Sequence, residues 1–245
     1  MNHLPSEQTF EIMKRTFLRF SAAVMVASIL FACQKDMSSN ARTELTSSGS
    51  SSSSSFTIAS DCGQLRTQTQ GGWGAAPAGN NPGTYLHAHF KAAFGEFLTV
   101  GCYPNNYYIK LTSAQAITDL LPTGGKAAAL TSSAVDPASL KNVLVGQIVA
   151  LKLSVSFDAW DANFGSSTVP LGNMIIGSGT FKGTTVSEFL AIAEQVLGGC
   201  SSQYTPTQVV ETATSINENF DDGTTNKGFL TCPNDGGGGG EPLPG

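Results

Sequence analysis

Charged and histidine side chains are scarce in this sequence of 245 residues. Only 13% of the residues are charged, Lys and Arg together number 13, and there are 3 His. A nucleic-acid-binding protein needs clustered Lys and Arg to neutralise phosphates, so the composition excludes that class and predicts no nucleic-acid partner. A disordered chain is excluded as well, because 40% of the residues are hydrophobic, which is normal for a globular protein.

Sequence motifs of catalysis and of cofactor binding are also missing. There is no Gly-x-Ser-x-Gly nucleophile motif and no Cys-x-x-Cys pair. Gly177 and Gly179 precede a predicted helix, but Lys182 stands where a dinucleotide fingerprint needs Gly. Gly124-Gly125-Lys126 lacks the upstream Gly and the following Ser or Thr of a phosphate-binding loop. We therefore predict a non-enzymatic protein that takes no cofactor.

One segment alternates polar residues as the start of a calcium-binding loop does, namely Asn217, Asn219 and Asp221. The required glycine falls one place late, at Gly223, and Gly228 occupies the twelfth position in place of Glu. We expect this segment to close a helix and predict no metal site.

The N-terminal apolar run, Phe20–Phe31, is too short for a transmembrane helix, which needs roughly 20 residues. Lys14, Arg15 and Arg19 precede it and small residues follow it, as in a secretory signal peptide. We assign residues 1–32 to this signal peptide and expect translation to start at Met13, because residues 1–12 have no signal character.

The end of the signal peptide, Leu30-Phe31-Ala32-Cys33, resembles the lipobox of bacterial lipoproteins. The resemblance implies cleavage before Cys33, diacylation of its thiol and acylation of its new amine with palmitate-like chains. Two or three acyl chains hold a protein stably on a bilayer, since each buried CH₂ contributes about 0.8 kcal/mol. Phe31 departs from the usual small or hydroxyl residue. The alternative is an ordinary signal peptide whose Cys33 forms a disulfide.

The residues after Cys33 bear on localisation. Gln34 is not the Asp that resembles an inner-membrane retention signal, and Lys35-Asp36 is similar to a short tag for the outer face. The resemblance thus implies an outer-membrane lipoprotein exposed at the cell surface, with the membrane as one partner.

Composition divides the rest of the chain into three parts. Residues 33–60 contain the acylated Cys33 and a Ser-rich stretch that is too polar to bury itself, so we predict a flexible tether. Residues 61–233 form one predicted globular domain. Residues 234–245, rich in Gly, form a predicted disordered tail.

Four cysteines lie in the predicted domain, Cys62, Cys102, Cys200 and Cys232. In an exported protein an even number of cysteines predicts disulfides, here two. Three pairings are open. Cys62–Cys232 with Cys102–Cys200 would join the two ends of the domain, but the sequence does not choose among them.

Hydrophobic periodicity predicts a mainly α, disulfide-braced domain of about five helices with one or two short β-hairpins. The expected helices begin near residue 82, at Thr112 or Ser113, at Asp136-Pro137, at Thr184 or Thr185, and at Thr205-Pro206, and the last of them reaches about Phe220. The expected hairpin pairs residues 97–100 with 107–111, and residues 174–176 suggest a further strand. Apolar residues nearly surround the helix expected after Asp136, so we predict that it is central.

Several blocks in one order resemble a bacterial domain of unassigned activity. They are Thr69-Gln70-Gly71-Gly72-Trp73-Gly74, residues 79–83, residues 142–153, Gly198-Gly199-Cys200 and residues 216–223. The domain occurs in secreted and surface proteins and opens with Thr-Gln-Gly-x-Trp; here Gly72 replaces its usual Tyr. The resemblance implies an exported domain and assigns no residue a role.

Two sets of residues are candidates for a binding surface. Asp158 and Asp161 flank Trp160, an arrangement that could serve glycan binding or cleavage and could equally be a solvated helix end. Trp73, Tyr107 and Tyr108 could recognise a sugar or an envelope protein, or could belong to the core. The predicted function is binding or scaffolding at the cell envelope, with a glycan-binding or glycan-cleaving accessory protein as the alternative.

Overall fold

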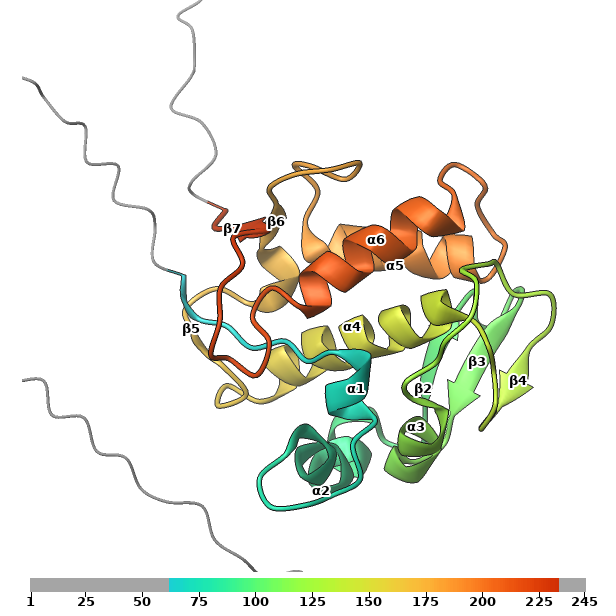
Figure 1. Ribbon diagram of the computed structural model, residues 1–245, viewed down its shortest axis with the longest axis horizontal. Coiled ribbons are helices and arrows are strands. Elements are labelled where there is room, and N and C mark those ends of the chain that lie inside the picture. The colour runs from blue at the N-terminus through green and yellow to red at the C-terminus, as the bar shows by residue number, and fades with distance from the viewer. Residues whose placement is uncertain (1–61, 234–245) are drawn as a thin grey trace, which may run out of the picture. The chain divides into compact units, whose positions relative to one another are not determined.

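The longest helix, α4 (Val143–Trp160), runs through the middle of the domain in the computed structural model, which describes residues 62–233 (Figure 1). Ten of its residues are buried, and they lie on every side of the helix. A helix that is apolar all round must be covered by other elements. By length and composition α4 could cross a membrane, but its side chains form the core of this domain. The prediction of a central helix is confirmed.

Five helices and a sheet cover α4. Figure 1 shows α5 (Val186–Leu197) and α6 (Pro206–Asn217) above it, and α1 (Gln70–Trp73), α2 (Pro82–Phe94) and α3 (Ala114–Leu120) below it. The helices α2, α3, α5 and α6 each begin with a side-chain cap. The caps are Asn81, Ser113, Thr185 and Thr205, and each accepts a hydrogen bond from a backbone N–H of the first turn. These caps satisfy backbone N–H groups that have no partner within the helix.

The strands are short. β2 (Leu98–Gly101) pairs antiparallel with β3 (Tyr108–Leu111), and β4 (Ala134–Val135) joins β3 in parallel. Two further pairs have two residues a strand: β1 (Gly63–Gln64) with β5 (Ser166–Ser167), and β6 (Ile175–Ile176) with β7 (Leu230–Thr231). A 3₁₀ turn, η1, spans Leu171–Asn173. The domain is thus helix-rich with a few short strands, and the predicted hairpin is confirmed.

Two predicted boundaries differ from the structure, and one helix was not predicted. The helix expected at Asp136 begins at Val143, because Asp136 has φ of 48° and its carboxylate accepts hydrogen bonds from Thr112 instead of capping a helix. Asn142 is the true cap, and its Oδ1 accepts from the N–H of Leu144. The helix α6 ends at Asn217 rather than near Phe220. The short α1, a sixth helix, was not predicted.

Two disulfides brace the domain, Cys62–Cys232 and Cys102–Cys200. The first joins the two ends of the described chain and is buried, with its cysteines 7% and 8% exposed. The second ties the β2–β3 turn to the residues after α5. The structure selects this pairing from the three that the sequence left open.

The contact between the β2–β3 turn and the end of α5 depends on a residue without a side chain. A Cβ on Gly198 would lie 2.4 Å from the backbone N of Cys102 and 2.6 Å from the backbone O of Tyr107. Both atoms belong to the ladder bond from Cys102 N to Tyr107 O, so neither can move without breaking it.

We predict that Gly198→Ala lowers the free energy of unfolding by about 1–3 kcal/mol, the usual range for an overpacked contact. Urea denaturation of the oxidised domain measures this loss. Gly71→Ala is the matched control, because its Cβ would have only an ordinary 3.9 Å contact and Ala favours the helix. An equal loss in both variants would contradict the prediction.

Candidate functional site

The C-terminal end of α4 exposes a large aromatic side chain. Trp160 is the last residue of the helix and is 44% exposed. Its ring lies 5.5 Å from that of His89, which in turn lies 4.5 Å from that of Tyr85, both on α2. We call Tyr85, His89, Trp160 and Asp161 together the Trp160 surface. The spacing of Tyr85 and His89, four residues apart, places both on one face of α2.

A hydrogen-bonded carboxylate fixes this surface. Asp161 Oδ2 accepts from the Tyr85 hydroxyl at 2.7 Å, and Oδ1 accepts from the backbone N–H of Asn163 at 2.9 Å. These bonds, that from Tyr85 above all, hold the pKa of Asp161 below its usual range. Burial, reinforced by the same bond, raises the pKa of the Tyr85 hydroxyl. Asp161 therefore stays ionised and joins α2 to the end of α4.

Asp158, one helical turn earlier, has a different partner. Its Oδ2 accepts a 2.6 Å hydrogen bond from the backbone N–H of Leu171, at the start of η1. Burial raises the pKa of Asp158, although this hydrogen bond acts against the rise. Each of the two carboxylates thus serves as an acceptor that joins α4 to a neighbouring segment. This use supports the helix-end alternative considered for them above.

Two adjoining hollows lie beside this end of α4. The smaller, a cavity of about 90 Å³, is lined in part by Gln64, Arg66, Asn163 and Ser166. The larger, about 400 Å³, lies between residues 63–65 and the loop of residues 223–226. Gln64, Leu65 and Gly223 line both hollows. We call the smaller one the Arg66 hollow.

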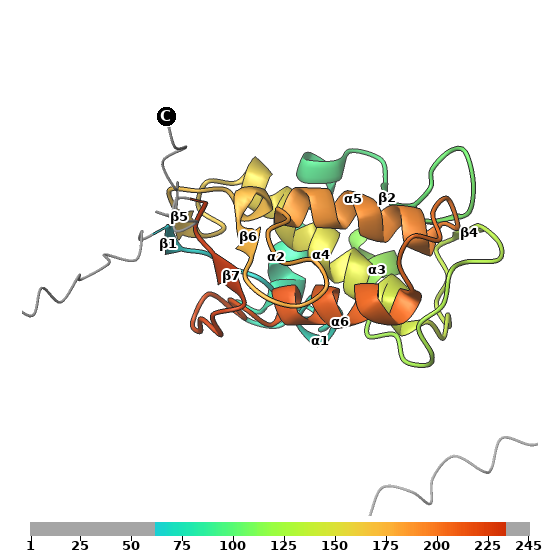
Figure 2. The same cartoon turned by 90° about the horizontal axis from the view of Figure 1, so that it is seen from above.

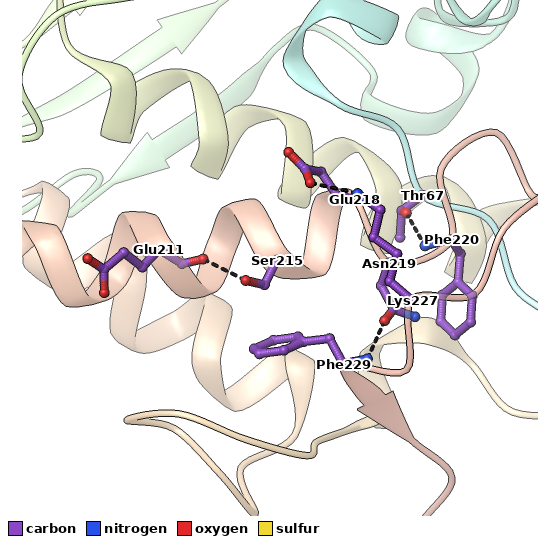
Figure 3. Close-up of polar contacts among 8 residues, drawn as sticks. All are labelled: Thr67, Glu211, Ser215, Glu218, Asn219, Phe220, Lys227 and Phe229. Carbon is purple, nitrogen blue, oxygen red and sulfur yellow. Dashed lines mark hydrogen bonds and ion pairs between the residues drawn. The ribbon is translucent and has the colours of Figure 1, made fainter.

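The loop that forms one wall of these hollows is held by a buried amide. Asn219 is completely buried, and its Oδ1 accepts from the backbone N–H groups of Phe229 and Leu230 (Figure 3). The backbone O of Asn219 also accepts from the N–H of Lys227, whose ammonium pairs with Glu218 at 2.8 Å. Asn219 thus closes the loop of residues 219–230.

Residues 63–65 form the opposite wall of the hollows, and Thr67, which follows them, is hydrogen-bonded to the same loop. Figure 3 shows its hydroxyl beside the backbone N of Phe220, a 3.0 Å hydrogen bond. The backbone of Thr67 donates to Phe220 O and accepts from Asp222 N, both at 3.0 Å. Residues on either side of Thr67 therefore have a fixed path along the hollows.

The structure separates the residues predicted to form a binding surface. Trp73 is fully buried, and its Nε1 donates to Ser154 Oγ at 3.3 Å, so it belongs to the core. Tyr107, 40% exposed, and Tyr108 lie on the β2–β3 hairpin, at the other end of the long axis from β1 and β5 (Figures 1 and 2). Asp158, Trp160 and Asp161 lie together at the C-terminal end of α4, and Trp73 is buried beneath them, with its ring 6.5 Å from that of Tyr85.

The sequence did not predict three further residues at this end of the molecule. Tyr85 and Asn163 donate hydrogen bonds to Asp161, and Arg66 lines the smaller hollow. The two histidines of α2 have separate partners: His87 Nε2 lies 3.0 Å from Thr118 Oγ1 on α3, whereas His89 contacts Trp160. Among residues 62–233, no group of three or more His, Cys, Asp or Glu could hold a metal ion. The signal peptide, Cys33, the tether and the tail lie outside the described residues.

Comparison with known proteins found no match among family models, curated proteins or solved structures. The resemblances to the lipobox and to the Thr-Gln-Gly-x-Trp domain therefore stay predictions.

We predict that Tyr85→Phe raises the pKa of Asp161 toward its usual value, because the strongest bond to the carboxylate is lost. The depressed pKa makes Asp161 stabilise the fold above the unfolded pKa, and this contribution disappears as the pH falls through the folded pKa. The acid-induced loss of stability should accordingly become smaller in Tyr85→Phe.

NMR titration of the Asp161 carboxyl measures the shift. Tyr107→Phe, at the far end of the domain, is the control and should leave the Asp161 pKa unchanged. An unchanged Asp161 pKa in Tyr85→Phe would refute the assigned hydrogen bond.

Proposed function

We propose that this chain is an envelope lipoprotein that acts by binding rather than by catalysis. Acyl chains on Cys33 anchor it to the outer membrane, and the polar residues 34–60 tether the domain, with a root-mean-square reach of about 30 Å. The resemblance of Lys35-Asp36 to a tag for the outer face supports exposure at the cell surface. The observation that carries the proposal is the pair of disulfides, since such bonds persist in oxidising compartments outside the cytosol.

The Cys62–Cys232 bond also suits a tethered domain. It brings both ends of the domain to one place, directly after the stretch that we assign to the tether. The remaining surface is then free to meet a partner in the envelope. The use of Asp158 and Asp161 as internal acceptors supports a binding role, because neither carboxylate is left for acid–base chemistry without disrupting a contact.

Metabolic labelling with radioactive palmitate tests the anchor. We expect wild-type protein to carry label and sediment with membranes, and Cys33→Ala to lose both properties, because the acylated thiol is gone. A variant with Cys102→Ala and Cys200→Ala is the control and should keep the label. Unlabelled wild-type protein with its leader still attached would refute the proposal, and protease treatment of intact cells tests surface exposure.

A second candidate function, glycan binding, is favoured by the Trp160 surface. A sugar ring has an apolar face and a rim of hydroxyls. The half-exposed ring of Trp160 could stack on the apolar face of the sugar. The Asp161 carboxylate and the Asn163 amide lie next to this ring and could bind the sugar hydroxyls. This candidate names a class of ligand that the general proposal leaves open.

Glycan-array binding tests this candidate. We expect Trp160→Ala to weaken binding about tenfold or more, as truncation of a central aromatic contact does. Tyr107→Ala, which removes an exposed aromatic at the far end, should bind like the wild type. Because the chain has 2 Trp and Trp73 is buried, a change in fluorescence emission on binding reports on Trp160. An empty array, or an unchanged signal for Trp160→Ala, would count against glycan binding.

A further inference from the structure

Arg66 is held in place at the edge of the Arg66 hollow. Its guanidinium lies 5.8 Å from the centre of the Phe164 ring, and Phe164 is itself 2% exposed. The next residue, Thr67, is fixed by three hydrogen bonds to the loop of residues 220–222. Both the backbone and the end of the side chain are thus positioned before any ligand arrives, which lowers the entropy lost on binding.

No carboxylate among residues 62–233 forms an ion pair with this guanidinium, since the two ion pairs there use Lys152 and Lys227. Two acids lie beside Gly223 in the facing loop, and both have other roles. Asp222 Oδ1 accepts from Gln68 Nε2 at 3.1 Å, and Asp221 bridges through its backbone to Thr67. The positive charge of Arg66 is therefore available to an external anion, in a chain whose net charge is −5.

The other groups that line the hollow are amides, hydroxyls and backbone. Gln64, Asn163 and Ser166 offer both donors and acceptors, which suit the hydroxyls of a sugar. Arg presents a planar fork that binds a carboxylate through two parallel hydrogen bonds. A cavity of about 90 Å³ has room for a carboxylate group but not for a whole saccharide.

Asn163 links the hollow to the Trp160 surface. Residues 160–166 run from one to the other, and Asn163 both lines the hollow and donates to Asp161 Oδ1. The Phe164 ring contacts the Arg66 guanidinium, and its centre lies 5.3 Å from that of the Tyr85 ring. A sugar stacked on Trp160 could therefore be followed by a second unit at Arg66.

We propose that Arg66 binds the carboxylate of an acidic glycan, a saccharide containing uronic acid, whose neighbouring ring lies on the Trp160 surface. This inference rests on the second candidate function and names its ligand class. Arg66 supplies the preference for acid, and Trp160 supplies affinity that does not depend on charge.

Fluorescence titration with hexagalacturonate and with its methyl ester tests the inference. The two probes share their rings and differ in charge at the carboxyl groups. We expect the acid to bind about tenfold more tightly than the ester, the ratio that one charge-assisted contact gives. Arg66→Gln should bind both equally while its affinity for the ester stays that of the wild type, and Arg66→Lys should keep only part of the preference.

Lys126→Gln is the matched control, because it removes one exposed positive charge from a loop outside the hollow and should keep the preference. Melting temperatures show whether each variant is folded. Equal binding of the two probes by wild type, or an equal loss of preference in Lys126→Gln, overturns the role of Arg66 and leaves glycan binding standing. Failure of both probes overturns this ligand class, whereas membrane anchoring is judged separately by the Cys33→Ala experiment.

Discussion

The need to cover α4 on every side organises this domain. Leu144, Val145, Leu153 and Phe157 are completely buried, yet they point in different directions from one helix. Helices of ordinary amphipathicity, α5 and α6, cover one side, and the short α1 and α2 cover the other. Gly146 lets α1 approach so closely that a Cβ there would collide with the Gln70 side chain. The C-terminal end of α4 is left at the surface, and its last residue, Trp160, is exposed there.

Local signals in the sequence predicted the elements that local interactions form. Thr185 and Thr205 build capping boxes, and each was expected to begin a helix. Asp136 misled the prediction, because its preference for a cap was overridden by hydrogen bonds to Thr112, 24 residues away. The two-residue strands β1, β5 and β7 have too few residues to show a period of two, whereas the apolar run of residues 174–176 did indicate β6. Gly-rich α1 has low helix propensity and forms by packing on α4.

The candidate site was only partly predictable for the same reason. Asp158, Trp160 and Asp161 adjoin in the sequence and so were grouped correctly at one end of a helix. For Trp73 the sequence left a binding surface and the core open, and the structure selects the core, because its indole N–H has a buried partner, Ser154, in α4. Arg66 carries no local signal at all. Its neighbours Phe164 and Gly223 are about a hundred or more residues away, and only the folded chain brings them together.

The covalent closure of the domain at Cys62 and Cys232 has a mechanical consequence. Without this bond, a force applied from the N-terminal side of residue 62 would first separate β1 from β5 and then break the hydrogen bonds of Thr67. The disulfide passes such a load directly to Cys232, near the other end of the described domain. Shear from flowing liquid would then stretch a covalent link before it strained the hollows next to it.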